Sequence, residues 1–255
     1  LANCDDGEVT CGAGTYWDMQ SQSCVVANPS DTDFDGCVGM IDLLDLLSVF
    51  GTCAEVPWEC GDPLEYQGYD YETVQIGEQC WFAENLRSEN YRNGEVIPGN
   101  LSDDDWSTTT GGAMAIFAED LLNLDTYGRL YNWHAVEDAR ALCPNGWHVP
   151  SDLEWTVFTD FLGGEAAAGE KMKEMSGWFN GGNGTNSSGF SGLPGGTRLY
   201  NGNWHNNGAV GSWWSSSLTG SPAWYRSLTW NDEGVFRLYG NVLFGFSIRC
   251  IQDSE

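Results

Sequence analysis

The sequence is poor in basic residues. It contains 10 Lys and Arg against 37 Asp and Glu, which gives a formal net charge of −27 at pH 7. A surface of this charge repels phosphate backbones, so we expect no nucleic-acid partner. The same charge favours solubility and attracts divalent cations.

Long apolar runs are missing as well. No stretch approaches the roughly 18 consecutive apolar residues of a membrane-spanning helix, so we expect no membrane span. The 3 histidines (His134, His148 and His205) are scattered, and no Cys-x-x-Cys pair occurs. Structural zinc sites are built from such residues at close spacing, so we expect no zinc.

Patterns typical of catalysis are also absent. The sequence has no Gly-x-Ser-x-Gly motif, and its carboxylates are too numerous for one pair to stand out as a glycosidase dyad. His148 lies in the turn 146–150, where we interpret it as a structural histidine that hydrogen-bonds the backbone. We therefore expect a protein that is not an enzyme.

Cysteines, by contrast, are plentiful. In an acidic chain rich in Gly and Trp, 9 cysteines indicate an oxidising compartment and hence a secreted, extracellular protein. The odd number leaves one thiol free, or paired to another chain or to a residue outside this sequence. The cysteines are Cys4, Cys11, Cys24, Cys37, Cys53, Cys60, Cys80, Cys143 and Cys250.

The segment 31–42 has the spacing of a calcium loop. Carboxylates stand at positions 1, 3, 5 and 12 of a twelve-residue loop, with Gly36 at position 6 for the sharp turn. Ca²⁺ prefers oxygen ligands, and position 7 supplies a backbone carbonyl. The predicted ligands are Asp31, Asp33, Asp35, the carbonyl of Cys37, and Asp42.

This loop resembles the calcium loop of a dockerin repeat, because it ends in Asp and an apolar helix follows it. Asp42, Asp45 and Ser48 are the polar positions of that helix, so most of its circumference needs cover. We find no second repeat. We therefore interpret the segment as one EF-hand-like, calcium-stabilised structural unit that packs on the rest of the chain or on another subunit, and not as a cohesin-binding module.

The chain divides into four parts by composition. We expect a small Cys-rich module at 1–27, the calcium loop and helix at 28–54, a linker at 55–62, and a large domain at 63–255. In the large domain we expect helices over 134–142, from Ser151 to about 162, and over 165–175. The expected strands are Thr197–Tyr200, Trp213–Ser217, Trp224–Thr229, Val235–Tyr239 and Gly245–Ile251.

A series of sequence blocks in the large domain resembles the FISUMP domain, the Fibrobacter succinogenes major paralogous domain. The blocks are Tyr71–Gly77, Trp81–Leu86, Tyr127–Trp133, Cys143–Asp152, Gly189–Gly196, Trp213–Ser217 and Gly245–Cys250. The resemblance implies a secreted or surface protein of Bacteroidetes-like bacteria. It also implies an α+β fold of the C-type-lectin-like group, with two to three helices and Trp-rich antiparallel strands. It implies no catalytic residues.

Within this domain we expect the disulfides Cys143–Cys250 and Cys60–Cys80. Cys37 pairs either with Cys53 or with the N-terminal arm. Trp230-Asn231-Asp232 is similar to an element of calcium-dependent lectins, but we interpret it as a hairpin turn, and Asp103–Asp105 as a solvated loop. Of the late tryptophans we expect most in the core and a minority exposed; they are Trp204, Trp213, Trp214, Trp224 and Trp230.

Together these observations favour a non-catalytic, calcium-stabilised extracellular protein of a bacterial cell surface. Its role is structural or adhesive, and self-assembly into a fibre is one form of that role. Its partners are other copies of itself or a surface protein or glycan. A lectin-like glycan-binding module is the alternative, and an enzyme of unknown type is the third hypothesis.

Overall fold

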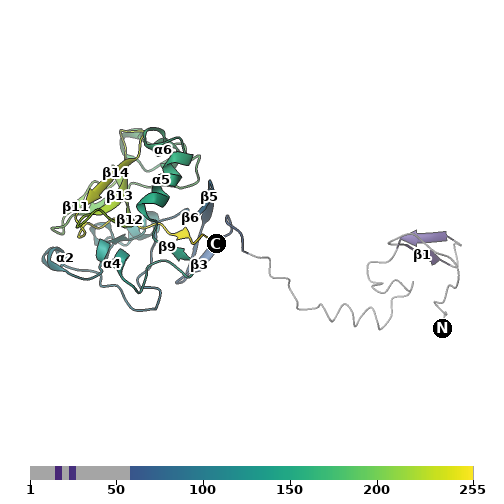
Figure 1. Ribbon diagram of the computed structural model, residues 1–255, viewed down its shortest axis with the longest axis horizontal. Helices are drawn as coiled ribbons and strands as arrows, with labels where there is room; N and C mark the ends of the chain where they lie inside the picture. Colours follow the sequence, from purple (N-terminus) through teal and green to yellow (C-terminus); the bar gives the residue numbers. More distant parts are fainter. Residues whose placement is uncertain (1–14, 19–22, 27–57, 255) are drawn as a thin grey trace. The chain divides into compact units, whose positions relative to one another are not determined.

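The computed structural model describes residues 15–18, 23–26 and 58–254 (Figure 1). The chain forms two compact units, Leu1–Pro57 and Trp58–Glu255. In the first unit, β1 (Thr15–Asp18) pairs antiparallel with β2 (Ser23–Val26), so that Trp17 lies opposite Cys24. The predicted calcium loop and its helix lie outside the described residues, as does the predicted choice of partner for Cys37.

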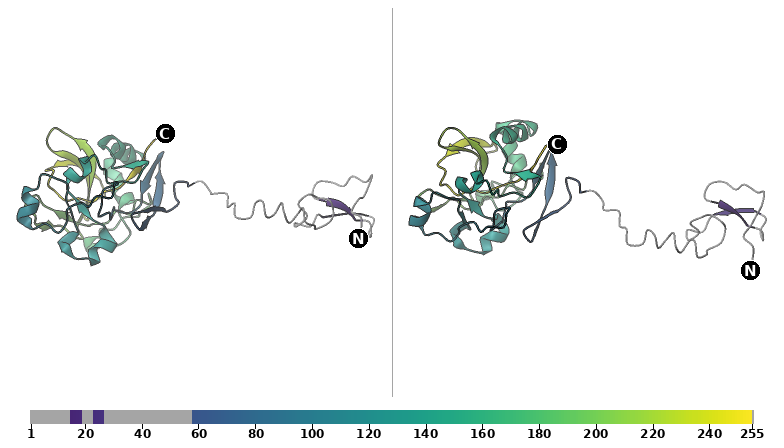
Figure 2. Two further views of the ribbon diagram at one scale, coloured as in Figure 1. Left: turned by 90° about the horizontal axis from the view of Figure 1, so that it is seen from below. Right: turned by 60° about the horizontal axis from the view of Figure 1, so that its bottom comes forward.

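A four-stranded sheet joins the beginning and the end of the second unit. Its order is β5 (Thr73–Ile76), β6 (Gln79–Phe82), β15 (Ile251–Gln252) and β9 (Trp147–His148). The two-residue turn between β5 and β6 begins at Gly77, whose φ of 63° suits a tight hairpin. The C-terminal strand thus lies between segments from early and middle parts of the chain (Figure 2).

A three-stranded antiparallel sheet forms the other large layer. β13 (Ala223–Thr229) lies between β12 (Val210–Leu218) and β14 (Phe236–Gly240). Trp213 and Trp214 are neighbours on β12 and therefore point to opposite faces, yet both are fully buried. Near these tryptophans both faces of β12 are consequently covered by the rest of the domain.

Short hairpins and helices complete the unit. Three two-stranded sheets pair β3 (Leu64–Tyr66) with β4 (Tyr69–Tyr71), β7 (Met114–Ala115) with β8 (Leu130–Tyr131), and β10 (Thr197–Arg198) with β11 (Trp204–His205). The helices are α2 (Asp103–Thr108), α3 (Leu122–Tyr127), α4 (Trp133–Glu137), α5 (Asp152–Phe161) and α6 (Glu165–Met172), with 3₁₀ turns at Phe117–Glu119 and Phe179–Gly181. The predicted α+β class is confirmed. In the described residues no helix has the length and apolar character to cross a membrane.

The predicted start of α5 is confirmed. The Ser151 side chain accepts a hydrogen bond from the Glu154 N–H, and the Glu154 carboxylate accepts one from the Ser151 N–H. This reciprocal pair satisfies two N–H groups that the first turn of a helix leaves free. The helix ends before Gly163 and Gly164, as predicted.

The buried face predicted for α5 is partly wrong. Phe158 and Leu162 are buried as expected, but the exposed side chains are Leu153, Val157 and Phe161. The helix turns Trp155 and Thr159 inward instead, because the Trp155 indole meets Trp81 at 4.7 Å between ring centroids. Burying an indole removes more apolar surface from water than burying Leu153.

Two other expected elements differ from the structure. The helix expected over 134–142 ends at Glu137, because the Asp138 carboxylate accepts a hydrogen bond from the Arg140 N–H and forms a local turn. The strand expected over Gly245–Ile251 is an extended segment that bridges Arg198, Tyr131 and Trp213 in turn before β15 begins. The other four expected strands correspond to β10, β12, β13 and β14.

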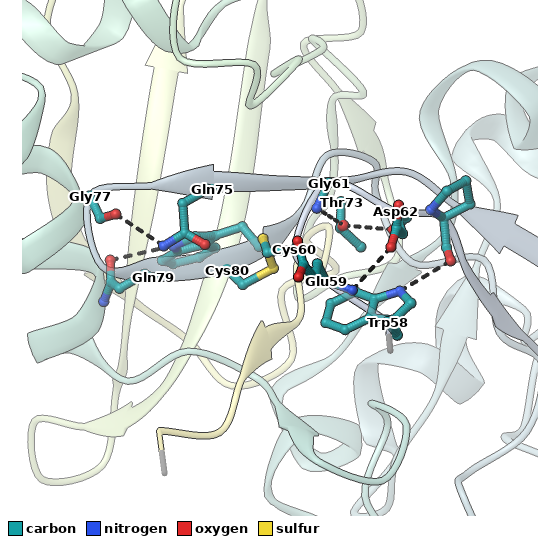
Figure 3. Close-up of a disulfide and its surroundings, with 12 residues drawn as sticks. Trp58, Glu59, Cys60, Gly61, Asp62, Thr73, Gln75, Gly77, Gln79 and Cys80 are labelled. Atoms are coloured by element: carbon teal, nitrogen blue, oxygen red, sulfur yellow. Dashed lines mark hydrogen bonds between the residues drawn. A yellow bond between two sulfur atoms is a disulfide. The ribbon is translucent and has the colours of Figure 1, made fainter. Parts of the chain in front are cut away.

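Both predicted disulfides of the second unit are present. Cys143–Cys250 fixes the turn before β9 to the segment just before β15, and both cysteines are buried. Cys60–Cys80 fixes the start of the unit to β6 (Figure 3). Residues 58–62, placed in a linker by the sequence, are therefore part of the packed unit, with the Trp58 ring against Trp147 at 5.7 Å.

Candidate functional site

All ten basic side chains of the protein lie in the second unit, and each donates a hydrogen bond to a carbonyl or carboxylate of that unit. These residues are Arg87, Arg92, Arg129, Arg140, Lys171, Lys173, Arg198, Arg226, Arg237 and Arg249. The cations thus hold loops and strands together. The remaining surface charge is mostly that of unpaired carboxylates, which excludes a broad basic patch for an anionic polymer.

Arg249 is almost fully buried, as are Arg198 and Arg226 among these cations. Its guanidinium donates to the side chain of Asn85 at 2.8 Å and to the carbonyls of Phe82, Phe190 and Ser191. Burial lowers the pKa of Arg249, but these oxygen acceptors favour the charged form. Arg249 and Asn85 also line the first of three adjoining hollows on the surface.

The three hollows share lining residues, and we call them together the central groove. The first, of about 380 Å³, shares Tyr69, Arg87 and Asp125 with the second, of about 320 Å³. The second shares Glu89 and Arg129 with the third, of about 360 Å³. The walls of the first two hollows come mainly from the β3–β4 hairpin, the segment 83–90, and α3 with the residues after it, while segments 96–100 and 114–121 line the third.

The middle of the groove is polar and internally braced. Tyr69 donates a hydrogen bond to Glu84 at 2.5 Å, and Arg87 binds the same carboxylate oxygen at 3.0 Å. The Arg87 guanidinium also lies over the Tyr69 ring, 4.0 Å from its centroid. Burial first, and then the neighbouring Glu84, raise the pKa of Tyr69 to about 12, so its hydroxyl stays a hydrogen-bond donor.

Beside this cluster, groups without a partner line the second hollow. The buried Oγ of Ser88 and the buried Nε of Arg87 have no hydrogen-bond partner within residues 58–254. Arg129 donates to the carbonyl of Arg87 at 2.9 Å and pairs with Glu89. Asp125 on α3 is exposed, and no described residue hydrogen-bonds its carboxylate. Ser88 Oγ and Arg87 Nε are enclosed by the protein, so of these groups the exposed Asp125 carboxylate is the one that can accept a hydrogen bond from a bound molecule.

Apolar residues make up most of the lining of the third hollow. Ile97, Met114 and Ile116 are buried in its lining, whereas Val96 and Leu121 are 69% and 71% exposed at its margin. An extended chain in the central groove would therefore meet polar side chains first and apolar side chains at this end.

Several residues singled out in the sequence have other roles than expected. His148 binds two carboxylates rather than the backbone: its Nδ1 lies 2.6 Å from Asp253 and its Nε2 lies 2.9 Å from Glu154. The hydrogen bond to Glu154 is the main cause that raises the pKa of His148. Asp103–Asp105 form the first turn of α2 rather than a loop, because Ser102 caps that helix.

The segment 230–232 forms a turn, as predicted. It lies in the connection between the antiparallel strands β13 and β14, where the Asp232 side chain accepts the Gly234 N–H at 2.7 Å. Within the described residues no group of His, Cys, Asp and Glu has the arrangement of a metal site.

The late tryptophans divide between the core and the surface. Trp213 and Trp214 are fully buried, while Trp204, Trp224 and Trp230 are partly exposed. Each of the partly exposed rings packs on one neighbouring aromatic ring: Phe117, Tyr239 and Phe179, respectively.

Sequence reasoning missed the central groove. Its residues come from seven separate segments between Gln67 and Arg249, and none carries a local motif of binding. The glycine at position 128 is the one local feature of the sequence that marks this region. In the structure Gly128 has φ of 70°, and an added Cβ would lie 2.9 Å from the carbonyl oxygen of Leu86. Such a position permits close backbone approach beside the groove.

No curated protein matches this chain, and no solved structure matches it. The family model of the Fibrobacter succinogenes major domain matches residues 74–252, which hold β5, β6, the central groove's segment 83–90 and the C-terminal strand. This chain belongs to the Fibrobacter succinogenes major domain family.

Proposed function

We propose that this chain is a non-catalytic, calcium-stabilised extracellular protein of a bacterial surface, and that it adheres to a partner protein through the central groove. The family suggests a surface domain. The two disulfides suit an oxidising compartment. The single dockerin-like calcium repeat at 31–42 and the C-type-lectin-like fold of the second unit belong to this proposal.

The central groove carries the proposal. A groove made of three adjoining hollows accommodates an extended segment better than a compact molecule. Its polar part presents the exposed carboxylate of Asp125 beside the partly buried Arg87, and its apolar end presents Val96 and Leu121. A polar part followed by an apolar end suits a polypeptide segment that places an apolar side chain in the third hollow.

Another copy of the same chain is the partner that we expect. Two copies of net charge −27 repel each other in dilute salt, because the Debye length at 0.1 M is about 10 Å and grows as salt is removed. Self-association should therefore become stronger as salt or Ca²⁺ screens the carboxylates. An interface held mainly by rim ion pairs would show the opposite dependence.

Sedimentation velocity of the full chain in calcium, over a range of protein and salt concentrations, tests the proposal. Val96→Glu and Leu121→Glu add charge at the apolar end of the groove, where both side chains are exposed, so folding should be kept. We expect both variants to remain monomeric where the native chain associates. Leu153→Glu, on the equally exposed face of α5, is the matched control and should associate normally.

A native chain that stays monomeric at high concentration in calcium would contradict self-association. A monomer that binds a glycan array would then favour the lectin-like alternative. That alternative has its own structural support, a hollow outside the central groove.

A further inference from the structure

A separate hollow of about 280 Å³ lies between the β10–β11 hairpin and the β12–β13 pair, and it shares no residue with the central groove. Its lining contains no Asp, Glu, Lys or Arg, although such residues make up 18% of the sequence. The lining residues are Thr197, Leu199, His205, Asn206, Val210, Ser212, Tyr225, Ser227, Thr229, Phe244 and Phe246. We call it the neutral pocket.

Strand alternation places the polar groups of the neutral pocket on one face of the sheet. Tyr225, Ser227 and Thr229 are alternate residues of β13, so their side chains point the same way. Ser212 lies opposite Ser227 in the ladder, and their hydroxyls are 3.1 Å apart. The two serine hydroxyls are buried and bond each other, while the partly exposed Tyr225 and Thr229 can donate to or accept from the hydroxyl groups of a ligand.

Tyr225 stands out within this row. Within residues 58–254 its hydroxyl makes no hydrogen bond, although the residue is more than half buried. Burial raises the pKa of Tyr225, which keeps the hydroxyl protonated and able to donate. The hydroxyl is therefore free to bond a ligand hydroxyl in the neutral pocket.

Aromatic rings form the other part of the lining. The Tyr225 and Phe246 rings lie 4.6 Å apart between centroids, and Phe244 lies 5.5 Å from Phe246. Aromatic faces pack against the C–H groups on the face of a saturated ring, while hydroxyls at the edge of that ring find polar partners. The neutral pocket combines both kinds of surface.

We infer that the neutral pocket binds one uncharged sugar residue. Its volume is close to the lower limit of small-ligand sites, which fits a single ring and not a longer chain. Its lack of charged side chains disfavours an ionised ligand, because burial of a charge without a partner is costly. Its hydroxyl row and aromatic rings favour a ligand that carries several hydroxyls on an apolar ring.

Ligand-observed NMR on the full chain tests this inference. The probes are the methyl glycosides of glucose, galactose, mannose and N-acetylglucosamine, with methyl glucuronide as the charged counterpart. We expect saturable binding of at least one neutral glycoside at millimolar concentration, and weaker or no binding of the glucuronide. Tyr225→Phe removes only the hydroxyl and should weaken binding about fivefold, the ratio that one typical net hydrogen bond gives.

Two further variants decide where the sugar binds. Thr229→Val removes a second hydroxyl of the same face and should also weaken binding. Tyr239 lies on the opposite face of the sheet, so the Tyr239→Phe variant should bind the sugar as the native chain does. Thermal unfolding of each variant confirms that the fold is kept.

The inference is overturned if no neutral glycoside binds saturably, or if Tyr225→Phe and Thr229→Val both bind like the native chain. It is also overturned if Val96→Glu in the central groove abolishes sugar binding while the neutral-pocket variants keep it. Failure of self-association leaves these outcomes unchanged, so the two proposals fail separately.

Discussion

Asp152 neutralises the fully buried guanidinium of Arg226. Asp152 Oδ1 accepts a hydrogen bond from Arg226 Nη1 at 2.7 Å, and the Arg226 side chain has no exposed surface. Arg237 binds the same carboxylate through Oδ2 at 2.7 Å and lies over the Trp224 ring at 3.8 Å. The first turn of α5 is thereby tied to both β13 and β14.

We predict that Asp152→Asn strongly destabilises the second unit. The variant leaves the buried Arg226 without a counter-charge, a change that typically costs about 3 kcal/mol or more. Burial raises the pKa of Asp152, but hydrogen bonds from Arg237 and Arg226 outweigh it and leave the pKa lowered. The stability that ionised Asp152 contributes should therefore be present above the pKa of about 3.9 that Asp has in an unfolded chain. It should be lost as the pH falls through the lower pKa that Asp152 has in the folded protein.

Urea unfolding at neutral pH measures this cost. Asp160→Asn is the control on the same helix, since its side chain is exposed and should change stability by less than about 0.5 kcal/mol. Equal midpoints for the two variants would show that the Arg226 pair contributes nothing beyond a surface ion pair.

We predict that the two disulfides contribute unequally. Cys143–Cys250 closes a separation of 107 residues, and Cys60–Cys80 closes one of 20. In the chain-entropy account, the longer loop contributes about 4.7 kcal/mol and the shorter about 3 kcal/mol. Guanidinium unfolding of the Cys143→Ser/Cys250→Ser and Cys60→Ser/Cys80→Ser double variants compares them, and a larger loss for the second pair would contradict the account.

Local signals in the sequence were sufficient for parts of the fold. Ser151 and Glu154 stand three residues apart before an apolar run, and the capping geometry depends on nothing else. The same run did not reveal which side of α5 is buried. That choice depends on Trp81 and Phe190, which belong to distant segments.

The candidate sites were harder to predict for the same reason. The segment Gly245–Ile251 contacts three different partners in succession, which no strand pattern encodes. Arg249 carries no motif, since the carbonyls of Phe82 and Phe190 that it binds are distant in the sequence and are brought near only by folding. Tyr225, Ser227 and Thr229 did belong to a predicted strand, but the absence of charge around them became visible only when the β10–β11 hairpin was placed.

We predict that His148 stabilises the second unit most at acidic pH. Its pKa is raised, first by the hydrogen bond to Glu154 and then by Asp253, with burial opposing. A raised pKa gives stability that is fully present below the unfolded value of 6.5 and is lost as the pH rises through the folded value. Glu154 is the complementary partner: burial raises its pKa, but His148 and Ser151 outweigh that and lower it to about 2.

Urea midpoints of His148→Gln and the native chain, taken between about pH 5 and pH 9, test this dependence. The difference should be largest at the acidic end and shrink toward the alkaline end. His205→Gln, at an exposed histidine without a carboxylate partner in the described residues, should show no such trend. A difference that grows with pH would mean that neutral His148 is the stabilising form.

The proposed calcium loop gives the last prediction. If Asp31, Asp33, Asp35, the carbonyl of Cys37 and Asp42 bind Ca²⁺ only in the folded chain, calcium should raise stability by mass action. At a hundredfold excess over the dissociation constant, this gain is about 2.7 kcal/mol. Calorimetric unfolding of the full chain should therefore show one transition that moves to lower temperature when a chelator is added.

The variant Asp33→Asn should weaken calcium binding in isothermal titration and reduce the shift caused by the chelator. Asp104→Asn, in the exposed first turn of α2, removes a carboxylate of equal charge outside the loop and should leave both measurements unchanged. Equal responses of the two variants would show that calcium acts through the general acidic surface, because an effect of net charge cannot distinguish Asp33 from Asp104. A response confined to Asp33 identifies a coordinated ion, since only ligation depends on the position of the carboxylate in the loop.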